Sequence, residues 1–185
     1  MKIFIKRVLG FFRCLIAGVE YPGDVYVGRH VHFVNGTKIE LGKHVQIRPD
    51  VDLFAGEVFR LGTGCDIGTR NRIVGNVIIG DYVLFGPDNY ICSEDHNYRD
   101  ISCPIMFQGT SAIHRNGHSE LKIGEGSWIG THVAIIGDVH IGCHCIVGAN
   151  SVILKDVPDY CVVAGNPARI IRQYNFKTGE WDKND

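Results

Sequence analysis

Histidine is the residue type in this sequence best suited to proton transfer, because imidazole titrates near neutrality. Most of the histidines fall on turn or outward positions of a six-residue repeat, where a surface role is expected. His96 differs, since it ends the last repeat before a long stretch without one. We expect His96 to lie at the edge of a cleft and to act as general base toward an alcohol, and the alternative is a surface histidine. The full set is His30, His32, His44, His96, His114, His118, His132, His140 and His144.

The cysteines do not follow a disulfide framework, and they do not form a convincing metal site. Their number is odd, seven, which favours a reducing cytoplasm. Cys143, His144 and Cys145 resemble zinc ligands, but the repeat turns Cys145 inward and the other two outward. Side chains that diverge in this way cannot surround one tetrahedral ion, so no metal is expected.

Composition and charge exclude several classes of protein. A length of 185 residues predicts one domain, and a hydrophobic content of 45% is too high for a disordered chain. Lys and Arg total 19 against 20 for Asp and Glu, a balance that argues against a nucleic-acid-binding protein. Lys6, Arg7 and Arg13 interrupt the apolar N-terminal stretch, so neither a signal peptide nor a membrane-spanning helix is expected.

The elements that must position these residues are defined by an aliphatic residue at every sixth position. One run extends from Leu61 to Ile91 and another from Ile123 to Ile153. A helix has a period of about 3.6 and an ordinary strand a period of 2, so neither explains the repeat. A period of six is typical of a parallel β-helix in which three short strands form one triangular coil. The aliphatic residue should point inward, and the small residue four positions later should fill the corner. We expect this domain over residues 25–160.

The repeat is interrupted twice. The step from Leu53 to Leu61 is eight, which predicts two inserted residues at one corner. The step from Ile91 to Ile123 is 32, so the phase of the repeat is lost there. Residues 97–120 are therefore expected to leave the solenoid at a corner and return, as an excursion loop. Loops of this length within a compact fold are usually functional.

The two ends should differ from the solenoid. In residues 1–24, Phe4, Val8, Phe11, Phe12 and Leu15 have helical spacing, which predicts an amphipathic helix whose apolar face covers the open end of the solenoid. The alternative for this basic helix is a peripheral contact with a membrane. Residues 161–185 should form a tail, with a short helix at 168–174 after the Gly165-Asn166-Pro167 break.

Several motifs resemble those of the hexapeptide-repeat acyltransferases, over about residues 25–174. They are the repeats themselves, Ser127-Trp128-Ile129-Gly130, the stretch 146–158 (IVGANSVILKDVP) and the stretch 163–169 (VAGNPAR). Asp95-His96-Asn97-Tyr98 at the start of the excursion is similar to the sugar and polysaccharide O-acetyltransferases, near the galactoside and maltose acetyltransferases. The resemblance implies a left-handed β-helix, a homotrimer, acetyl-CoA as donor, and active sites between neighbouring subunits.

The resemblance also implies roles for individual residues. His96 stands at the position of the family's catalytic histidine. Trp128 would lie beside the pantetheine of the donor, offered by a neighbouring subunit, and the pantetheine would run along the backbone near Thr131 and Ala149. The donor phosphates would be bound by Lys155, Arg169 and Arg172, for which a solvated surface charge is the alternative.

The excursion is expected to recognise the acceptor, because it begins one residue after the proposed base. Tyr98 offers an aromatic face for a sugar ring, and Arg99, Asp100 and Gln108 offer directional hydrogen bonds. The alternative is a purely structural loop that holds neighbouring subunits together.

Three other functions share this fold. An acetyltransferase that modifies streptogramin or chloramphenicol antibiotics has a similar repeat and excursion. A γ-type carbonic anhydrase needs three histidine ligands for zinc, but His114/His118 and His140/His144 have a spacing of four instead of the expected five. A non-catalytic scaffold would not need His96, Trp128 and a basic tail.

Overall fold

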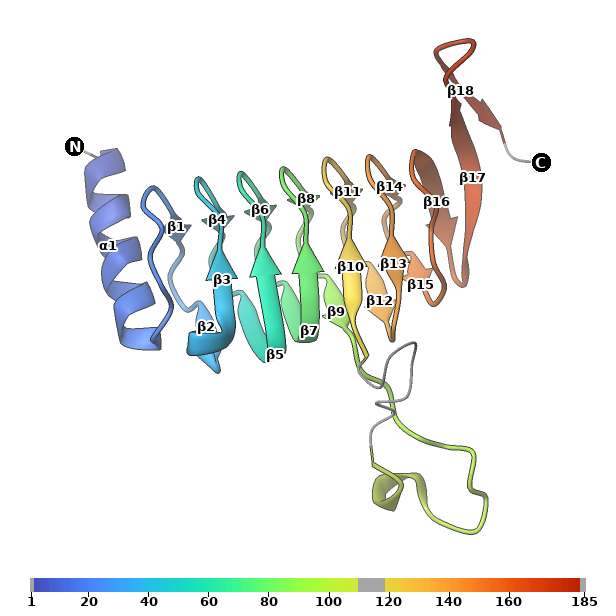
Figure 1. The fold of residues 1–185 in the computed structure, drawn as a ribbon, viewed down its shortest axis with the longest axis horizontal. Coiled ribbons are helices and arrows are strands. Elements are labelled where there is room, and N and C mark those ends of the chain that lie inside the picture. Colours follow the sequence, from blue (N-terminus) through green and yellow to red (C-terminus); the bar gives the residue numbers. More distant parts are fainter. Residues whose placement is uncertain (1, 110–118, 184–185) are drawn as a thin grey trace.

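The protein is a parallel β-solenoid with three faces, seen in a computed structural model that describes residues 2–109 and 119–183 (Figure 1). It has about six coils and matches the predicted left-handed β-helix. Face A is the sheet whose strands stack in the order β1 (Tyr26–Val27), β4 (Gln46–Ile47), β6 (Asp66–Ile67), β8 (Leu84–Phe85), β11 (Trp128–Ile129), β14 (Ile146–Val147) and β16 (Cys161–Gly165).

Faces B and C share two long strands that bend around a corner, β5 (Asp52–Leu61) and β7 (Arg72–Ile79). Face B also contains β2 (His32–Val34), β9 (Tyr90–Cys92), β12 (Ala134–Ile136) and β15 (Val152–Ile153). Face C also contains β3 (Ile39–Leu41), β10 (Leu121–Ile123) and β13 (His140–Ile141). The register of β5 on β7 shifts between Ala55 and Phe59, which confirms the predicted insertion at this corner.

The core is built from the repeat residues, stacked one coil above another. On face B, Leu53, Ile73, Ile91, Ile135 and Ile153 form one buried column. Small residues such as Cys65, Ser127 and Cys145 are buried at the corners, as the repeat predicts. Each coil thereby buries apolar area against the next coil, and this burial is the main driving force for stacking.

The corners, named here by the faces they join, carry residues with left-handed backbone conformation. At the AB corner, Asp50, Arg70, Asp88 and His132 all have φ between 54° and 63°. Asp50, Arg70 and Asp88 alternate in charge from coil to coil, and Arg70 donates two hydrogen bonds of 2.6 and 2.8 Å to the carboxylate of Asp88. This conformation costs energy for residues other than glycine, and such ion pairs offset part of the cost.

The BC corner is linked by side-chain hydrogen bonds. The Oδ1 of Asn76 accepts hydrogen bonds from the backbone N–H groups of Glu57 (2.7 Å) and Val58 (3.2 Å) in the coil below. Its Nδ2 donates to the carbonyl oxygen of Ser119 (3.2 Å), where the chain returns from the excursion. Backbone groups at the excursion's root therefore have partners from the neighbouring coils, which fixes where the loop departs.

Helix α1 (Lys2–Ala17) covers the N-terminal end of the solenoid, as predicted, but with a different face (Figure 1). Gly10, Cys14 and Ala17 pack on the first coil, whereas Val8, Phe12 and Leu15 are exposed, so the prediction for the apolar face was wrong. A Cβ on Gly10 would lie 2.6 Å from the carbonyl oxygen of Val25. Small residues let the helix approach the coil closely, which decides the inward face. Within the described residues, no helix is long and apolar enough to cross a bilayer.

The C-terminal tail is a β-hairpin, and the prediction of a short helix at 168–174 was wrong. Strand β17 (Ala168–Asn175) pairs antiparallel with β16 and with β18 (Glu180–Lys183). The hairpin therefore continues face A and projects past the last coil (Figure 1). Tyr160, Tyr174 and Phe176 pack edge to face or tilted at its base, with ring centroids 4.8–6.4 Å apart.

The excursion leaves the BC corner after β9 and returns in β10 (Figure 1). Its residues 97–109, 119 and 120 are described, and 110–118 lie outside the described residues. Two short 3-10 helices complete the secondary structure of the described chain: η1 (Gly36–Lys38) at the lower BC corner and η2 (Ile105–Phe107) in the excursion.

Candidate active site

His96 is exposed at the start of the excursion, four residues after the end of β9. Its backbone N–H donates to the carboxylate of the preceding Asp95, 2.7 Å away, so this carboxylate holds the main chain of His96. An exposed imidazole on a fixed backbone can exchange protons with a bound molecule. His96 does not line the groove described below, so its place at the edge of a cleft stays a prediction.

The described part of the excursion is closed by a neck and ordered by its own side chains. Asn97 forms the neck, donating from its backbone to Gly109 (3.0 Å) and from its side chain to the Gln108 carbonyl (3.1 Å). The Nε2 of Gln108 donates to the carbonyl oxygens of Asp100 (2.7 Å) and Cys103 (2.6 Å). Ser102 donates to the carboxylate of Asp100 and lowers its pKa.

The four predicted acceptor residues therefore divide into two kinds. Asp100 and Gln108 make hydrogen bonds that shape the loop itself. Tyr98 and Arg99 are exposed beside His96 and have side chains available to a ligand. A role in acceptor binding stays a prediction for all four.

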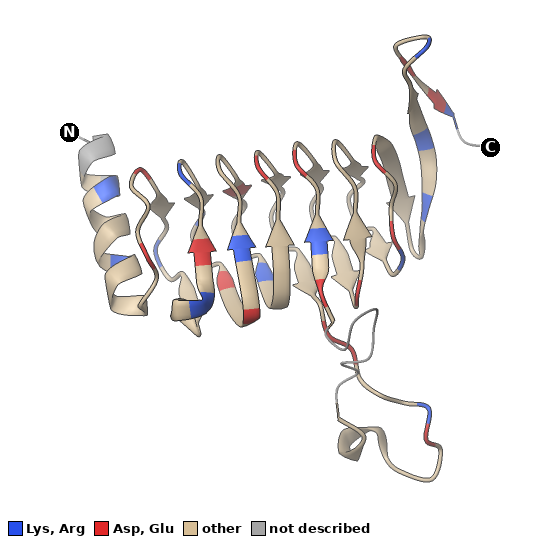
Figure 2. Ribbon diagram, in the orientation of Figure 1, with Lys and Arg blue, Asp and Glu red and all other residues tan. Residues whose placement is uncertain are grey.

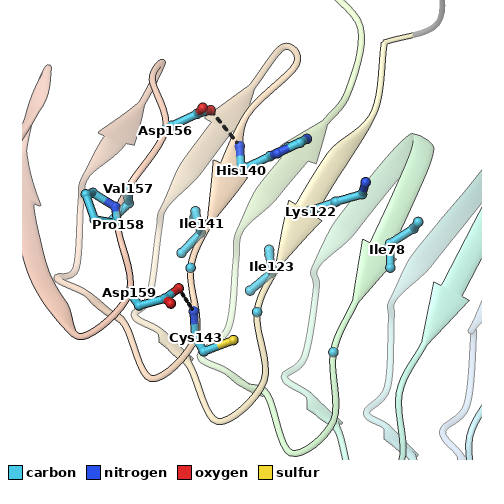
Figure 3. A pocket seen from close by; sticks show the side chains of 13 residues that line it. Ile78, Lys122, Ile123, His140, Ile141, Cys143, Asp156, Val157, Pro158 and Asp159 are labelled. Carbon is cyan, nitrogen blue, oxygen red and sulfur yellow. Dashed lines mark hydrogen bonds between the residues drawn. The ribbon is translucent and has the colours of Figure 1, made fainter. Parts of the chain in front are cut away.

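A groove of about 620 Å³ lies on face C, next to the root of the excursion. Ile78, Lys122 and His140 project into it from the neighbouring strands β7, β10 and β13, and residues 156–159 form one edge (Figure 3). The carboxylate of Asp156 accepts from the backbone of His140 (2.9 Å), and that of Asp159 accepts from the backbone of Cys143 (2.8 Å). These two bonds fix the edge against the strands.

Lys122 and His140 were missed as site residues by sequence reasoning. Each stands one position before an inward aliphatic residue, Ile123 or Ile141, and so each faces outward. The sequence offered one clue, which is that Lys122 follows the excursion almost directly, in the strand β10 through which the chain returns to the solenoid. Lys122 pairs with Glu120 at 2.5 Å, which keeps one charge balanced at the groove's rim.

A second pocket, of about 460 Å³, lies at the C-terminal end of the solenoid and contains two of the predicted donor-binding cations. Lys155 and Arg169 both line it, although one follows β15 and the other belongs to β17. Asp156 and Val157 line both this pocket and the groove on face C. The two cavities are therefore neighbours along one path from the last coil toward the excursion.

Trp128 is half exposed (50%) on face A, between Leu84 and Ile146 of the adjacent strands. Face A lies opposite the BC corner, since the chain passes from A to B to C in each coil. His96 and Trp128 of one chain consequently stand on opposite sides of the triangular prism. A site that contains both residues needs two chains.

The other three predicted donor residues also lie apart from the groove. Thr131 and Ala149 are in successive turns of the AB corner, where the hydroxyl of Thr131 donates to the Pro87 carbonyl at 3.0 Å. Arg172 lies along β17 opposite Val162 and donates to the Trp181 carbonyl at 3.2 Å. One chain therefore brings together Lys155 and Arg169, but not Thr131, Ala149 or Arg172.

Metal ligands do not gather in the part of the chain that the structure describes: no group of three His, Cys, Asp or Glu side chains is placed to hold an ion there. Cys145 is buried, and the ring of His144 stacks on Tyr160 with centroids 5.2 Å apart. His114 and His118, which the anhydrase alternative would require, lie outside the described residues.

Comparison with known proteins places this chain in a family. Residues 121–155 match the model of the bacterial transferase hexapeptide (six repeats). The putative lipopolysaccharide biosynthesis O-acetyl transferase WbbJ of Escherichia coli K12 is 33% identical over an alignment of 156 residues that covers 74% of this chain and 80% of that protein. A probable acetyltransferase of Mycobacterium tuberculosis is 30% identical over an alignment of 164 residues that covers 76% of this chain, and the chain spans only 52% of the length of that relative.

Solved structures show the same fold at low identity. AntD, an N-acyltransferase from Bacillus cereus in complex with dTDP and coenzyme A, superposes with a TM-score of 0.70 at 17% identity, covering 84% of this chain and 83% of that chain. A maltose O-acetyltransferase from Clostridium difficile 630 has a TM-score of 0.51 at 20% identity, covering 92% and 87%. With WbbJ related along most of both chains, this protein belongs to the hexapeptide-repeat acetyltransferase family.

Proposed function

We propose that the protein transfers the acetyl group of acetyl-CoA to a hydroxyl of a sugar or polysaccharide precursor. The observation that carries this proposal is the exposed His96 at the root of the excursion, on the coil whose strand β10 lines the groove on face C. The names of the relatives support a sugar acceptor, since they include the lipopolysaccharide O-acetyl transferase and a galactoside O-acetyltransferase of E. coli K12 that is 31% identical over 140 residues.

The donor fits the two neighbouring cavities. Lys155 and Arg169 supply cations for its phosphates at the C-terminal end of the solenoid. The groove on face C, with Ile78 and the glycines of its lining, suits an extended pantetheine arm. The thioester would then lie at the level of β10, where the excursion begins.

A neighbouring subunit completes the site in this proposal. Trp128 on face A of that subunit would cover the groove, with Thr131 and Ala149 on the adjoining corner beside the pantetheine. Arg172 on the projecting hairpin adds a cation for the donor's phosphates. The assembly is a homotrimer in a reducing cytoplasm, and the opposite placement of His96 and Trp128 in one chain supports the shared site.

The transfer is direct, without an acyl-enzyme. His96 removes the proton of the acceptor hydroxyl while that oxygen attacks the thioester carbon. When the carbon–sulfur bond breaks, the imidazolium returns the proton to the departing sulfur. The products are the O-acetylated acceptor and CoA with a free thiol, and the histidine is neutral again. No metal is needed for any of these steps.

The experiment is a thiol-release screen with acetyl-CoA and a panel of sugars, nucleotide sugars and antibiotics. We expect release that depends on a sugar or nucleotide sugar, with a mass increase of one acetyl group on that acceptor. His96→Ala serves as the matched control and should abolish the signal. Acetylation of an antibiotic alone would assign the protein to the drug-modifying class and overturn the sugar proposal.

A further inference from the structure

The outer side of α1 carries a stripe of large apolar side chains that no described part of the chain covers. This outer stripe is Ile5, Val8, Leu9, Phe12, Leu15 and Ile16. Their spacing of three or four residues places them on one side of the helix. Ile16 is 87% exposed, whereas Cys14 on the opposite side is fully buried. A stripe of this kind in water marks a surface that binds something.

The packing of α1 fixes the direction in which the outer stripe faces. Gly10 approaches the Val25 carbonyl, and a Cβ on Gly36 would clash with the carbonyl oxygen of Ala17. Arg13 donates to the carbonyl oxygen of Val27, and Arg7 pairs with Asp24 at 2.5 Å. These contacts hold the helix across the end of the solenoid (Figure 1), so the stripe faces away from the coils.

Charge identifies the partner. Helix α1 contains four basic residues (Lys2, Lys6, Arg7 and Arg13) and no acidic residue, although the whole chain has a net charge of −1. In Figure 2 the coloured part of the helix has blue bands and no red one. Of these charges, Asp24 balances that of Arg7. A second copy packed on the stripe would bring two such basic helices together without acidic partners in either helix. An anionic lipid surface satisfies both the apolar stripe and the positive charge.

We propose that α1 is an interfacial helix that docks the N-terminal end of the solenoid on an anionic membrane surface. The outer stripe enters the boundary between headgroups and acyl chains, and the excess positive charge of the helix, of which Asp24 balances only that of Arg7, attracts the helix to the acidic headgroups. The helix lies in the plane of the membrane, with the solenoid standing away from it. This inference does not depend on the acetyl-transfer reaction.

The test is sedimentation of the full-length protein with vesicles of phosphatidylcholine, alone or mixed with phosphatidylglycerol. We expect binding to the mixed vesicles that weakens as salt rises, because the screening length falls from about 10 Å at 0.1 M to about 3 Å at 1 M. The double variant Phe12→Glu/Ile16→Glu should bind roughly tenfold more weakly or not at all. Lys2→Gln/Lys6→Gln should lose the preference for phosphatidylglycerol.

Controls separate this result from unfolding and from self-association. Ile101→Glu changes a fully exposed apolar residue of the excursion and should leave vesicle binding intact. Circular dichroism and thermal unfolding should show that each variant is folded, and thiol release with a soluble acceptor should be unchanged in Phe12→Glu/Ile16→Glu. Wild-type protein that fails to sediment with the mixed vesicles overturns the proposal. So does a smaller oligomer of Phe12→Glu/Ile16→Glu without lipid, which would assign the stripe to a second copy.

Discussion

At the scale of single residues, the catalytic prediction concerns His96. We expect His96→Ala to remain folded while kcat falls by about two to four orders of magnitude, the range for loss of a general base. The exposed position of His96 means that its removal leaves no cavity in the core. Thiol-release kinetics measure kcat, and thermal unfolding measures the fold.

Another exposed histidine, far from the excursion along the solenoid, provides a matched control. His32 is also exposed, but it lies on β2 near the N-terminal end, where it pairs with Asp52 at 2.8 Å. His32→Ala should keep normal turnover. If His96→Ala retained near-normal activity as well, the base would be another group.

A second residue-scale prediction concerns acid stability. Hydrogen bonds from Arg70 lower the pKa of Asp88 from its ordinary value of 3.8. Because the folded state holds the proton less tightly than the unfolded state, this carboxylate stabilises the fold above pH 3.8, and the contribution is lost as pH falls through the lowered pKa. Denaturant unfolding against pH should therefore show a flatter acid decline for Asp88→Asn than for wild type.

Substitution of Arg70 tests whether its hydrogen bonds cause the lowered pKa of Asp88. In Arg70→Gln the pKa of Asp88 should return toward its ordinary value, so this contribution should largely disappear and the acid decline should be flatter than in wild type, as in Asp88→Asn. An acid decline that is the same in all three proteins would show that the pair does not contribute. The side chain of Arg70 is 58% exposed and that of Asp88 23%, so water reaches the pair and the effect should also shrink with added salt.

At the scale of elements, the excursion can be removed above its neck. Asn97 closes the neck through its bond to Gly109, so deletion of residues 99–107 should leave the root of the loop in place. We expect a higher KM for the acceptor, or no transfer, with little change in the Kd for acetyl-CoA. Steady-state kinetics and calorimetry measure the two quantities.

A length-matched replacement of residues 99–107 by glycine and serine separates acceptor recognition by side chains from the effect of loop length. If recognition depends on side chains such as Arg99, this variant should resemble the deletion. A variant of either kind that loses acetyl-CoA affinity but keeps its acceptor preference would place the excursion on the donor side.

The elements that the sequence predicted correctly are those set by local repetition. Each aliphatic residue of the six-residue period packs on its counterpart one coil away, so the period alone locates strands such as β6 and β11. The tail was predicted wrongly because its fold depends on a distant partner. The free edge of β16 pairs with β17, and the spacing within 168–174 contains no sign of that edge.

Dependence on distant partners also explains the wrong prediction for α1 and the residues missed at the site. Helical spacing showed where the large apolar residues gather, but Gly10 and Cys14 decide which side reaches the first coil. His96 could be identified from the sequence because it ends a repeat. The groove could not be predicted from the sequence, because Lys122 and His140 belong to different coils and become neighbours only when the coils stack.

At the scale of the whole molecule, the site should require two chains. His96→Ala and Trp128→Ala homo-oligomers should each be nearly inactive. If the two chains assemble at random in equal amounts, about a quarter of all sites should contain both intact residues, which corresponds to one of the three sites in each mixed trimer. Co-expression with two affinity tags isolates the mixed oligomers, and sedimentation should show a trimer.

The two tags also allow a control for this experiment. Oligomers in which both differently tagged chains carry His96→Ala, purified in the same way, should remain inactive. A stable and fully active monomer would contradict the shared site, and so would mixed oligomers without recovered activity.

The stacking of coils also sets a distance. Neighbouring strands of a sheet are about 4.8 Å apart, so the three steps from β1 through β4 and β6 to β8 raise the excursion's coil about 14 Å above the first coil. With α1 on a lipid surface, the number of lower coils would act as a ruler that holds His96 at a set height. An acceptor tethered to that surface would need a spacer long enough to reach this height, and each coil added or removed would change the required reach by about 4.8 Å.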